Sequence, residues 1–199
     1  MTNPIDAVEQ ALTNFKDEPG VLERLAFAST HSHGERALTD ELAYQLRRAG
    51  HRVGRECKAG GITRVDLVVN GEPFEVKSTF SKFGVVNTEA ATTSWLAADA
   101  HKLAPSTVPA HQIIAISTLI DGATHARFRV AEGSVPNMNQ MQVREAAIAR
   151  YRHLLGSNAL GGATQARLIH LGRGHLHDVG AVLTDVLLFT VDRRAPSST

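Results

Sequence analysis

The apolar residues of this chain follow two different periods. Spacings of three and four residues predict helices over residues 4–17, 21–29, 34–49, 87–103 and 138–155. Alternating or continuous apolar runs predict strands over residues 51–58, 63–70, 74–80, 111–120, 126–130, 166–171 and 182–191. The resulting order is helix, strand, hairpin, helix, strand and a mixed C-terminal part. This order favours an α/β fold with a mixed sheet.

The helix over residues 34–49 has the clearest end signals. Its apolar stripe consists of Leu38, Leu42, Leu46 and Ala49. Ser32 followed by Glu35 has the spacing of a capping box, and Gly50 suits the position just beyond the last turn. We therefore expect a well-defined amphipathic helix immediately before the first strand.

A β-hairpin is predicted after that first strand. Val65, Leu67 and Val69 alternate with other residues, and Asn70-Gly71 is a strong signal for a two-residue hairpin turn. The returning strand runs from Phe74 to Phe80. Further along, the apolar run over residues 111–120 predicts a strand that is buried on both faces.

Side-chain alternation gives this hairpin a possible chemistry. Glu75 and Lys77 share one face of their strand, and Asp66 points away from the apolar residues of its own strand. The turn then brings Asp66 toward Glu75. Two adjacent carboxylates repel each other, and a divalent cation such as Mg²⁺, which prefers oxygen ligands, relieves that repulsion. With Lys77 beside them, the three residues form a plausible set for cleaving phosphodiesters.

Asp66 and Glu75-Val76-Lys77, each inside an apolar strand, resemble the motif of the PD-(D/E)XK nuclease superfamily, which includes restriction endonucleases and repair nucleases. Val65 stands where the name motif has proline. The resemblance covers roughly residues 34–120 and implies a restriction-endonuclease-like mixed β-sheet flanked by helices, with an αβββαβ core. Residues 1–33 would form an N-terminal helical extension to a domain over 34–199, which is elaborated from about residue 121.

The resemblance also implies roles for individual residues. Asp66 and Glu75 would bind Mg²⁺, or Mn²⁺ in its place, together with the backbone carbonyl of Val76, and Lys77 would assist the attacking water. The family often adds a glutamate from the preceding helix. Glu35 lies near the apolar stripe of that helix and Glu41 about one position off it, so Glu35 is slightly favoured and both remain open.

Polar residues around the motif are candidates for contacts with nucleic acid. Ser78, Thr79 and Lys82 follow the motif directly, and Arg64 precedes Asp66 by two residues. Hydroxyl and cationic side chains in such positions can contact phosphate oxygens. We therefore expect these four residues to help position a DNA backbone.

Composition narrows the function only slightly. Of the 199 residues, 43% are hydrophobic and 21% charged, and the net charge of +1 neither favours nor excludes nucleic acid. No apolar run reaches the ~18 residues that span a membrane, and the first residues lack the features of a signal peptide. A cytoplasmic location is therefore expected.

The leading hypothesis is a magnesium-dependent endodeoxyribonuclease that acts on DNA, most simply as a homodimer. One alternative is a catalytically inactive DNA-binding or assembly module with the same fold. Another is a metal-dependent hydrolase of a different class, which would use the pairs His31-Ser32-His33 and His175-Leu176-His177. A zinc site needs three or four ligands, and the sequence shows no partner cluster for either pair.

Overall fold

The computed structural model describes residues 2–31, 33–120, 138–156, 164–176 and 180–191. The strand expected over residues 126–130 and the C-terminal tail lie outside these ranges. No helix in the described ranges is long and apolar enough to cross a membrane.

The helices fall into an N-terminal and a later group. The first group is α1 (Pro4–Asn14), the short 3₁₀ helix η1 (Phe15–Asp17), α2 (Val21–Thr30) and α3 (Gly34–Arg48). The later group is α4 (Ser81–Val86), α5 (Glu89–Leu103) and α7 (Gln140–Leu155). The helices match the sequence prediction except α4, which was not expected. Six residues are too few for a helical period to be recognised.

The strands are β1 (Val53–Ala59), β2 (Ile62–Val69), β3 (Glu72–Phe80), β4 (His111–Leu119), β5 (Thr164–Leu176) and β6 (Gly180–Thr190). They form one sheet in the order β1-β2-β3-β4-β6-β5. Only β3 and β4 are paired in parallel, and the other neighbours are antiparallel. The structure is therefore a mixed six-stranded sheet flanked by helices.

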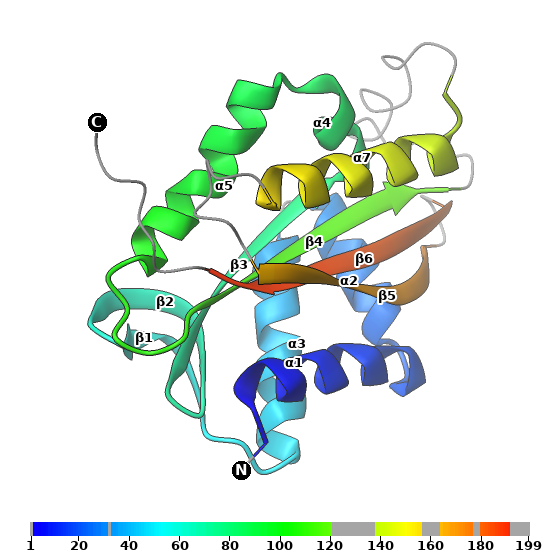
Figure 1. Cartoon of the computed structure of the whole chain (residues 1–199). Coiled ribbons are helices and arrows are strands. Elements are labelled where there is room, and N and C mark those ends of the chain that lie inside the picture. The colour runs from blue at the N-terminus through cyan, green and yellow to red at the C-terminus, as the bar shows by residue number, and fades with distance from the viewer. Residues whose placement is uncertain (1, 32, 121–137, 157–163, 177–179, 192–199) are drawn as a thin grey trace.

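Helices cover both faces of this sheet (Figure 1). On one face, apolar side chains of α1, α2 and α3 pack against residues such as Leu67, Val76 and Ile113. On the other face, α5 and α7 pack against Ile114, Ile116 and other strand residues. Every residue of β4 is buried, as its continuous apolar run predicted.

The hairpin between β2 and β3 closes as its sequence predicted. Asn70 and Gly71 have φ angles of 51° and 99°, which are those of a turn with both central residues left-handed. The backbone pairs run from Val69–Glu72 to Leu67–Phe74. Val65, Leu67 and Val69 are fully buried, whereas Asp66 is only half-buried. Asp66 therefore lies on the side of β2 that the alternation indicated.

The start of α3 is described only in part. The N-cap position is His33, whose side chain makes no capping hydrogen bond. The capping box expected from Ser32 and Glu35 depends on Ser32, which lies outside the described residues. At the other end, Gly50 adopts a φ of 85° and donates its N–H to the Arg47 carbonyl, so the glycine ends the helix as predicted.

Candidate functional site

Asp66 and Glu75 lie next to each other across the hairpin. Asp66 Oδ2 accepts a hydrogen bond of 2.8 Å from the backbone N–H of Val76, which follows Glu75 in β3. The two carboxyl groups are close enough to share a hydrogen bond. The structure thus brings together the two carboxylates that the alternation placed at this end of the hairpin.

Glu75 is an unusually placed carboxylate because it is buried, with 3% of its surface exposed. The Lys102 ammonium on α5 lies 2.5 Å from Glu75 Oε1, yet this oxygen receives no hydrogen bond of regular geometry. The pKa of Glu75 is raised to about 7: burial is the main cause, Asp66 adds to the rise, and Lys102 opposes it. The contact with Lys102 therefore does not offset the effect of burial on this carboxyl.

Lys77 extends from β3 toward α5, on the same face of the sheet as Glu75. Its ammonium lies 3.2 Å from Asp99 Oδ1, and the Gln112 side chain donates a hydrogen bond of 3.3 Å to Asp99 Oδ2. Burial raises the pKa of Asp99, although Lys77 opposes this change. Asp99 thus holds the Lys77 ammonium in position near the carboxylate pair.

The structure separates the two glutamates of α3. Glu41 accepts hydrogen bonds from Arg24 at 2.9 Å and from Gln45 at 3.2 Å, and so belongs to the contact between α2 and α3. Glu35 lies instead within the electrostatic field of the site. Its pKa is raised, first by burial and next by the negative charge of Asp66. Of the two candidates, only Glu35 faces the carboxylate pair.

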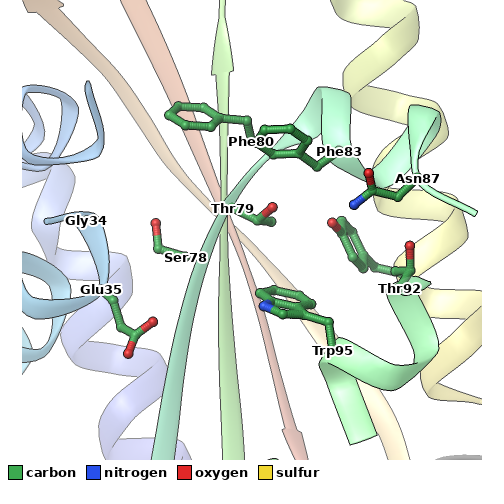
Figure 2. Close-up of a pocket in the computed structure, with 10 residues that line it drawn as sticks. Gly34, Glu35, Ser78, Thr79, Phe80, Phe83, Asn87, Thr92 and Trp95 are labelled. Carbon is green, nitrogen blue, oxygen red and sulfur yellow. The ribbon is translucent and has the colours of Figure 1, made fainter. Parts of the chain in front are cut away.

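A cleft of about 510 Å³ opens beside these residues (Figure 2). Glu35, Ser78 and Thr79 are among the residues that line it, so the two hydroxyl residues that follow Lys77 face open space next to the site. Gly34 lies directly against this strand, because a Cβ at that position would come within 2.6 Å of Ser78 Oγ. The absence of a side chain at Gly34 therefore lets the start of α3 approach β3.

The two basic residues expected to contact DNA have other surroundings. Arg64 is exposed and pairs with Glu56 at 3.0 Å. Lys82 is only 6% exposed, and burial lowers its pKa. A buried Lys82 is not available to a phosphate group on the surface. The structure therefore gives no support to a contact between Lys82 and the DNA backbone.

Three residues of α5 belong to the site but were missed in the sequence. Trp95 is half-buried and lines the cleft, with its ring centroid 5.7 Å from Lys77 Nζ. Asp99 contacts Lys77, and Lys102 contacts Glu75. The spacings of four and three residues from Trp95 to Asp99 to Lys102 place them on one helical face, which is the signal that could have identified them.

Of the two histidine pairs, the structure describes His31, His33 and His175. His31 stacks on Phe27, with ring centroids 4.1 Å apart, and contacts the carbonyl of the same residue. His175 is exposed on β5, whereas His177 lies outside the described residues. Among the described residues, no group of three or more His, Cys, Asp or Glu side chains has the geometry of a metal site.

The Asp66–Glu75 pair nevertheless fits a magnesium ion chemically. Mg²⁺ usually retains several waters and takes only one or two protein carboxylates, so a preformed cage of three side chains is not required. The donor set consists of two adjacent carboxylates, and Glu75 Oε1 is a buried oxygen without a regular hydrogen bond. Both features suit a hard divalent cation.

Comparisons with protein-family models, with curated proteins and with solved structures gave no match to this chain. The function therefore has to be argued from the site itself.

Proposed function

We propose that this protein is a magnesium-dependent nuclease that hydrolyses phosphodiester bonds in DNA. The observation that carries the proposal is the contact between Asp66 and Glu75, in which the buried Glu75 carboxyl has a pKa of about 7 although the Lys102 ammonium lies beside it. Residues with strongly shifted pKa values that gather at a cleft are typical of functional sites. Apart from the additional short helix α4, the segment from α3 to β4 has the αβββαβ order of the restriction-endonuclease-like core, and this order supports the same proposal.

The side chains of this site can take separate roles in hydrolysis. Asp66 and Glu75 would hold a divalent cation, which supplies charge stabilisation at the phosphoryl oxygens and a water of lowered pKa. Lys77, held by Asp99, would orient that water or neutralise the charge that develops on the phosphate. Water then adds to phosphorus, one P–O ester bond breaks, and the departing oxygen takes up a proton.

Ser78 and Thr79 lie directly after Lys77 and line the cleft, so a DNA backbone that enters the site would meet their hydroxyl groups. Glu35 also lines this region and feels the charge of Asp66, so it would act on a water of a bound cation. That two subunits combine to cut both strands remains a prediction from the family resemblance.

The proposal is tested by incubating supercoiled, linear and branched DNA with the protein and Mg²⁺. We expect cleavage that EDTA abolishes and that Mg²⁺ or Mn²⁺ restores. Asp66→Asn and Lys77→Ala should remove it, while Glu23→Gln, at an exposed position of α2, should not. Equal cutting by both site variants would overturn the assignment, and restoration by zinc alone would favour a hydrolase of another class.

An inactive binding module is the alternative that this experiment separates most directly. Such a protein would bind DNA in a mobility-shift assay but leave every substrate intact with either metal. A binding role does not require two adjacent carboxylates of which one, Glu75, is buried, and this pair is the observation that favours the enzyme.

A further inference from the structure

The cleft beside the site is built largely from aromatic side chains. Phe80 at the end of β3 and Phe83 on α4 contribute two rings, whose centroids lie 6.1 Å apart. Trp95 and Tyr151 contribute two more from α5 and α7, with centroids 6.2 Å apart. Figure 2 shows Phe80 and Phe83 near one end of the cleft and Trp95 near the other. The cleft therefore presents several flat apolar surfaces around one space.

The polar groups of the cleft are almost all neutral. Its lining adds the hydroxyl groups of Ser78, Thr79 and Thr92 and the amide of Asn87. Among the described residues that line it, Glu35 carries the only charged side chain, and none is a lysine or an arginine. A phosphate group would find no cationic partner here, whereas a flat neutral ring with hydrogen-bonding edges would find both aromatic faces and polar groups.

The cleft is also continuous with the proposed catalytic residues. Glu35 lines it and feels the charge of Asp66, and Ser78 and Thr79 follow Lys77 along β3. The Trp95 ring lies 5.7 Å from the Lys77 ammonium. A ligand in the cleft would therefore lie beside a phosphate bound at Asp66, Glu75 and Lys77.

A volume of about 510 Å³ falls within the range of pockets that hold small organic ligands. Phe83 is 42% exposed although its ring is apolar, so an aromatic surface is left open to solvent next to the cleft. In nucleic-acid recognition, such rings stack on bases that are not paired in a duplex.

We propose that this cleft receives the base of an unpaired nucleotide next to the phosphodiester that is cut. The proposal rests on the proposed nuclease function and adds its substrate class, which is DNA that is single-stranded or locally unpaired at the cleavage position. In an intact duplex each base is stacked and paired, and it would have to leave the helix to reach these rings.

The single tryptophan of the chain allows base binding to be measured without catalysis. A thymidine pentanucleotide is titrated into the protein in EDTA while Trp95 fluorescence is recorded. A base stacked near this indole should quench its emission in a saturable manner. A blunt hairpin duplex at the same nucleotide concentration should quench much less. Absence of saturable quenching by the pentanucleotide, or equal quenching by the duplex, would overturn the proposal.

Variants localise the binding to the cleft. Phe83→Ala should weaken binding of the pentanucleotide about tenfold, since stacking on one aromatic ring is worth roughly 1–3 kcal/mol. Phe27→Ala is the matched control, because Phe27 is a 57% exposed phenylalanine on α2 that does not line the cleft. Equal affinities of the two variants would place the binding elsewhere and contradict the proposal.

Cleavage assays keep this proposal distinct from the proposed function. With Mg²⁺, we expect faster cutting of single-stranded or forked DNA than of blunt duplex, with that preference reduced in Phe83→Ala. Cutting of duplex DNA without saturable quenching would support the nuclease function and contradict the proposed base-binding site. Quenching that is reduced in Phe83→Ala, without any cutting, would support the base site and overturn the nuclease.

Discussion

Two buried carboxylates on inner strands of the sheet have very different neighbours. Asp185 on β6 is 1% exposed and receives two hydrogen bonds of 2.6 Å from the Arg144 guanidinium of α7. Its Oδ1 also lies 2.5 Å from His170 Nδ1. Glu75 on β3 is 3% exposed, and its neighbours are a second carboxyl and a lysine without regular hydrogen-bond geometry.

The difference separates a structural contact from the carboxyl at the centre of the proposed site. A bidentate guanidinium satisfies a carboxylate in both geometry and charge, so Asp185 ties α7 to the sheet. Glu75 has neither a bidentate partner nor a balanced charge. Burial alone therefore does not mark a functional residue, whereas burial combined with incomplete compensation does.

The largest effect should come from removing the charge of the Asp66–Glu75 pair. We expect Glu75→Gln and Asp66→Asn each to lower the rate of DNA cleavage about a thousandfold, equivalent to roughly 4 kcal/mol of transition-state stabilisation. Single-turnover cleavage with saturating Mg²⁺ measures this loss. Asp185→Asn, assayed at a temperature where it stays folded, is the comparison and should keep the rate within about twofold. A comparable loss in Asp185→Asn would erase the distinction.

Asp185 should instead dominate stability. Asp185→Asn leaves the Arg144 guanidinium without its carboxylate, and breaking a buried pair in this way typically costs about 3 kcal/mol. Urea unfolding at neutral pH measures the change. Because the side chain of Arg144 is only 14% exposed, the double variant Arg144→Met with Asp185→Leu should recover part of the loss. A single variant as stable as the parent chain would show that this pair is not a structural anchor.

The pH dependence of the free energy of unfolding should reveal the raised pKa of Glu75. Its pKa rises from 4.5 to about 7 in the folded chain, so the unfolded state loses this proton first as the pH rises. The contribution of Glu75 to the free energy of unfolding is fully present below about pH 4.5. It is lost as the pH rises through 7, and the loss is at most about 3 kcal/mol. Glu35 and Asp99, whose pKa values are also raised, act in the same direction.

Urea unfolding of the metal-free protein between pH 4.5 and pH 8, in EDTA, measures this decline. Glu75→Gln should reduce the slope and be the more stable protein at pH 8, whereas Glu23→Gln should retain the parent slope. A slope that is unchanged in Glu75→Gln would mean that this carboxyl is ionised in the folded chain throughout the range.

The smallest expected effect separates the two glutamates of α3. Glu35→Gln should slow cleavage about tenfold, roughly 1.4 kcal/mol, because Glu35 lies in the field of Asp66 and lines the cleft. Glu41→Gln should change only the contacts with Arg24, which is largely exposed, and with Gln45, and so leave the rate unaltered. The same single-turnover assay compares them. A greater loss of cleavage rate in Glu41→Gln than in Glu35→Gln would assign the role to Glu41 instead.

What could be predicted from the sequence depended mainly on how local each contact is. The turn at Asn70-Gly71 and the strict alternation of β2 place Asp66 near Glu75 within a single hairpin. The choice between Glu35 and Glu41 could not be made from periodicity, because both lie close to the same stripe. It was decided by α2, whose Arg24 pairs with Glu41.

For α5, the sequence shows only that Trp95, Asp99 and Lys102 share one helical face. Asp99 and Lys102 reach the site because the crossover between the parallel strands β3 and β4 lays this helix over the β3 residues. Trp95 is partly buried and packs at the edge of the core. The arrangement of packed layers, and not the local pattern, determines which face of such a helix meets the site.

The hydrogen bond from Val76 N–H to Asp66 Oδ2 gives position 66 two separable requirements. The hairpin needs an oxygen there to satisfy a backbone amide, whereas the proposed chemistry needs a negative charge. Asparagine meets the first requirement and fails the second, and alanine fails both. A descendant of this chain that abandoned catalysis could therefore exchange Asp66 for asparagine at little structural cost, and loss of activity would be an easier evolutionary step than loss of the fold.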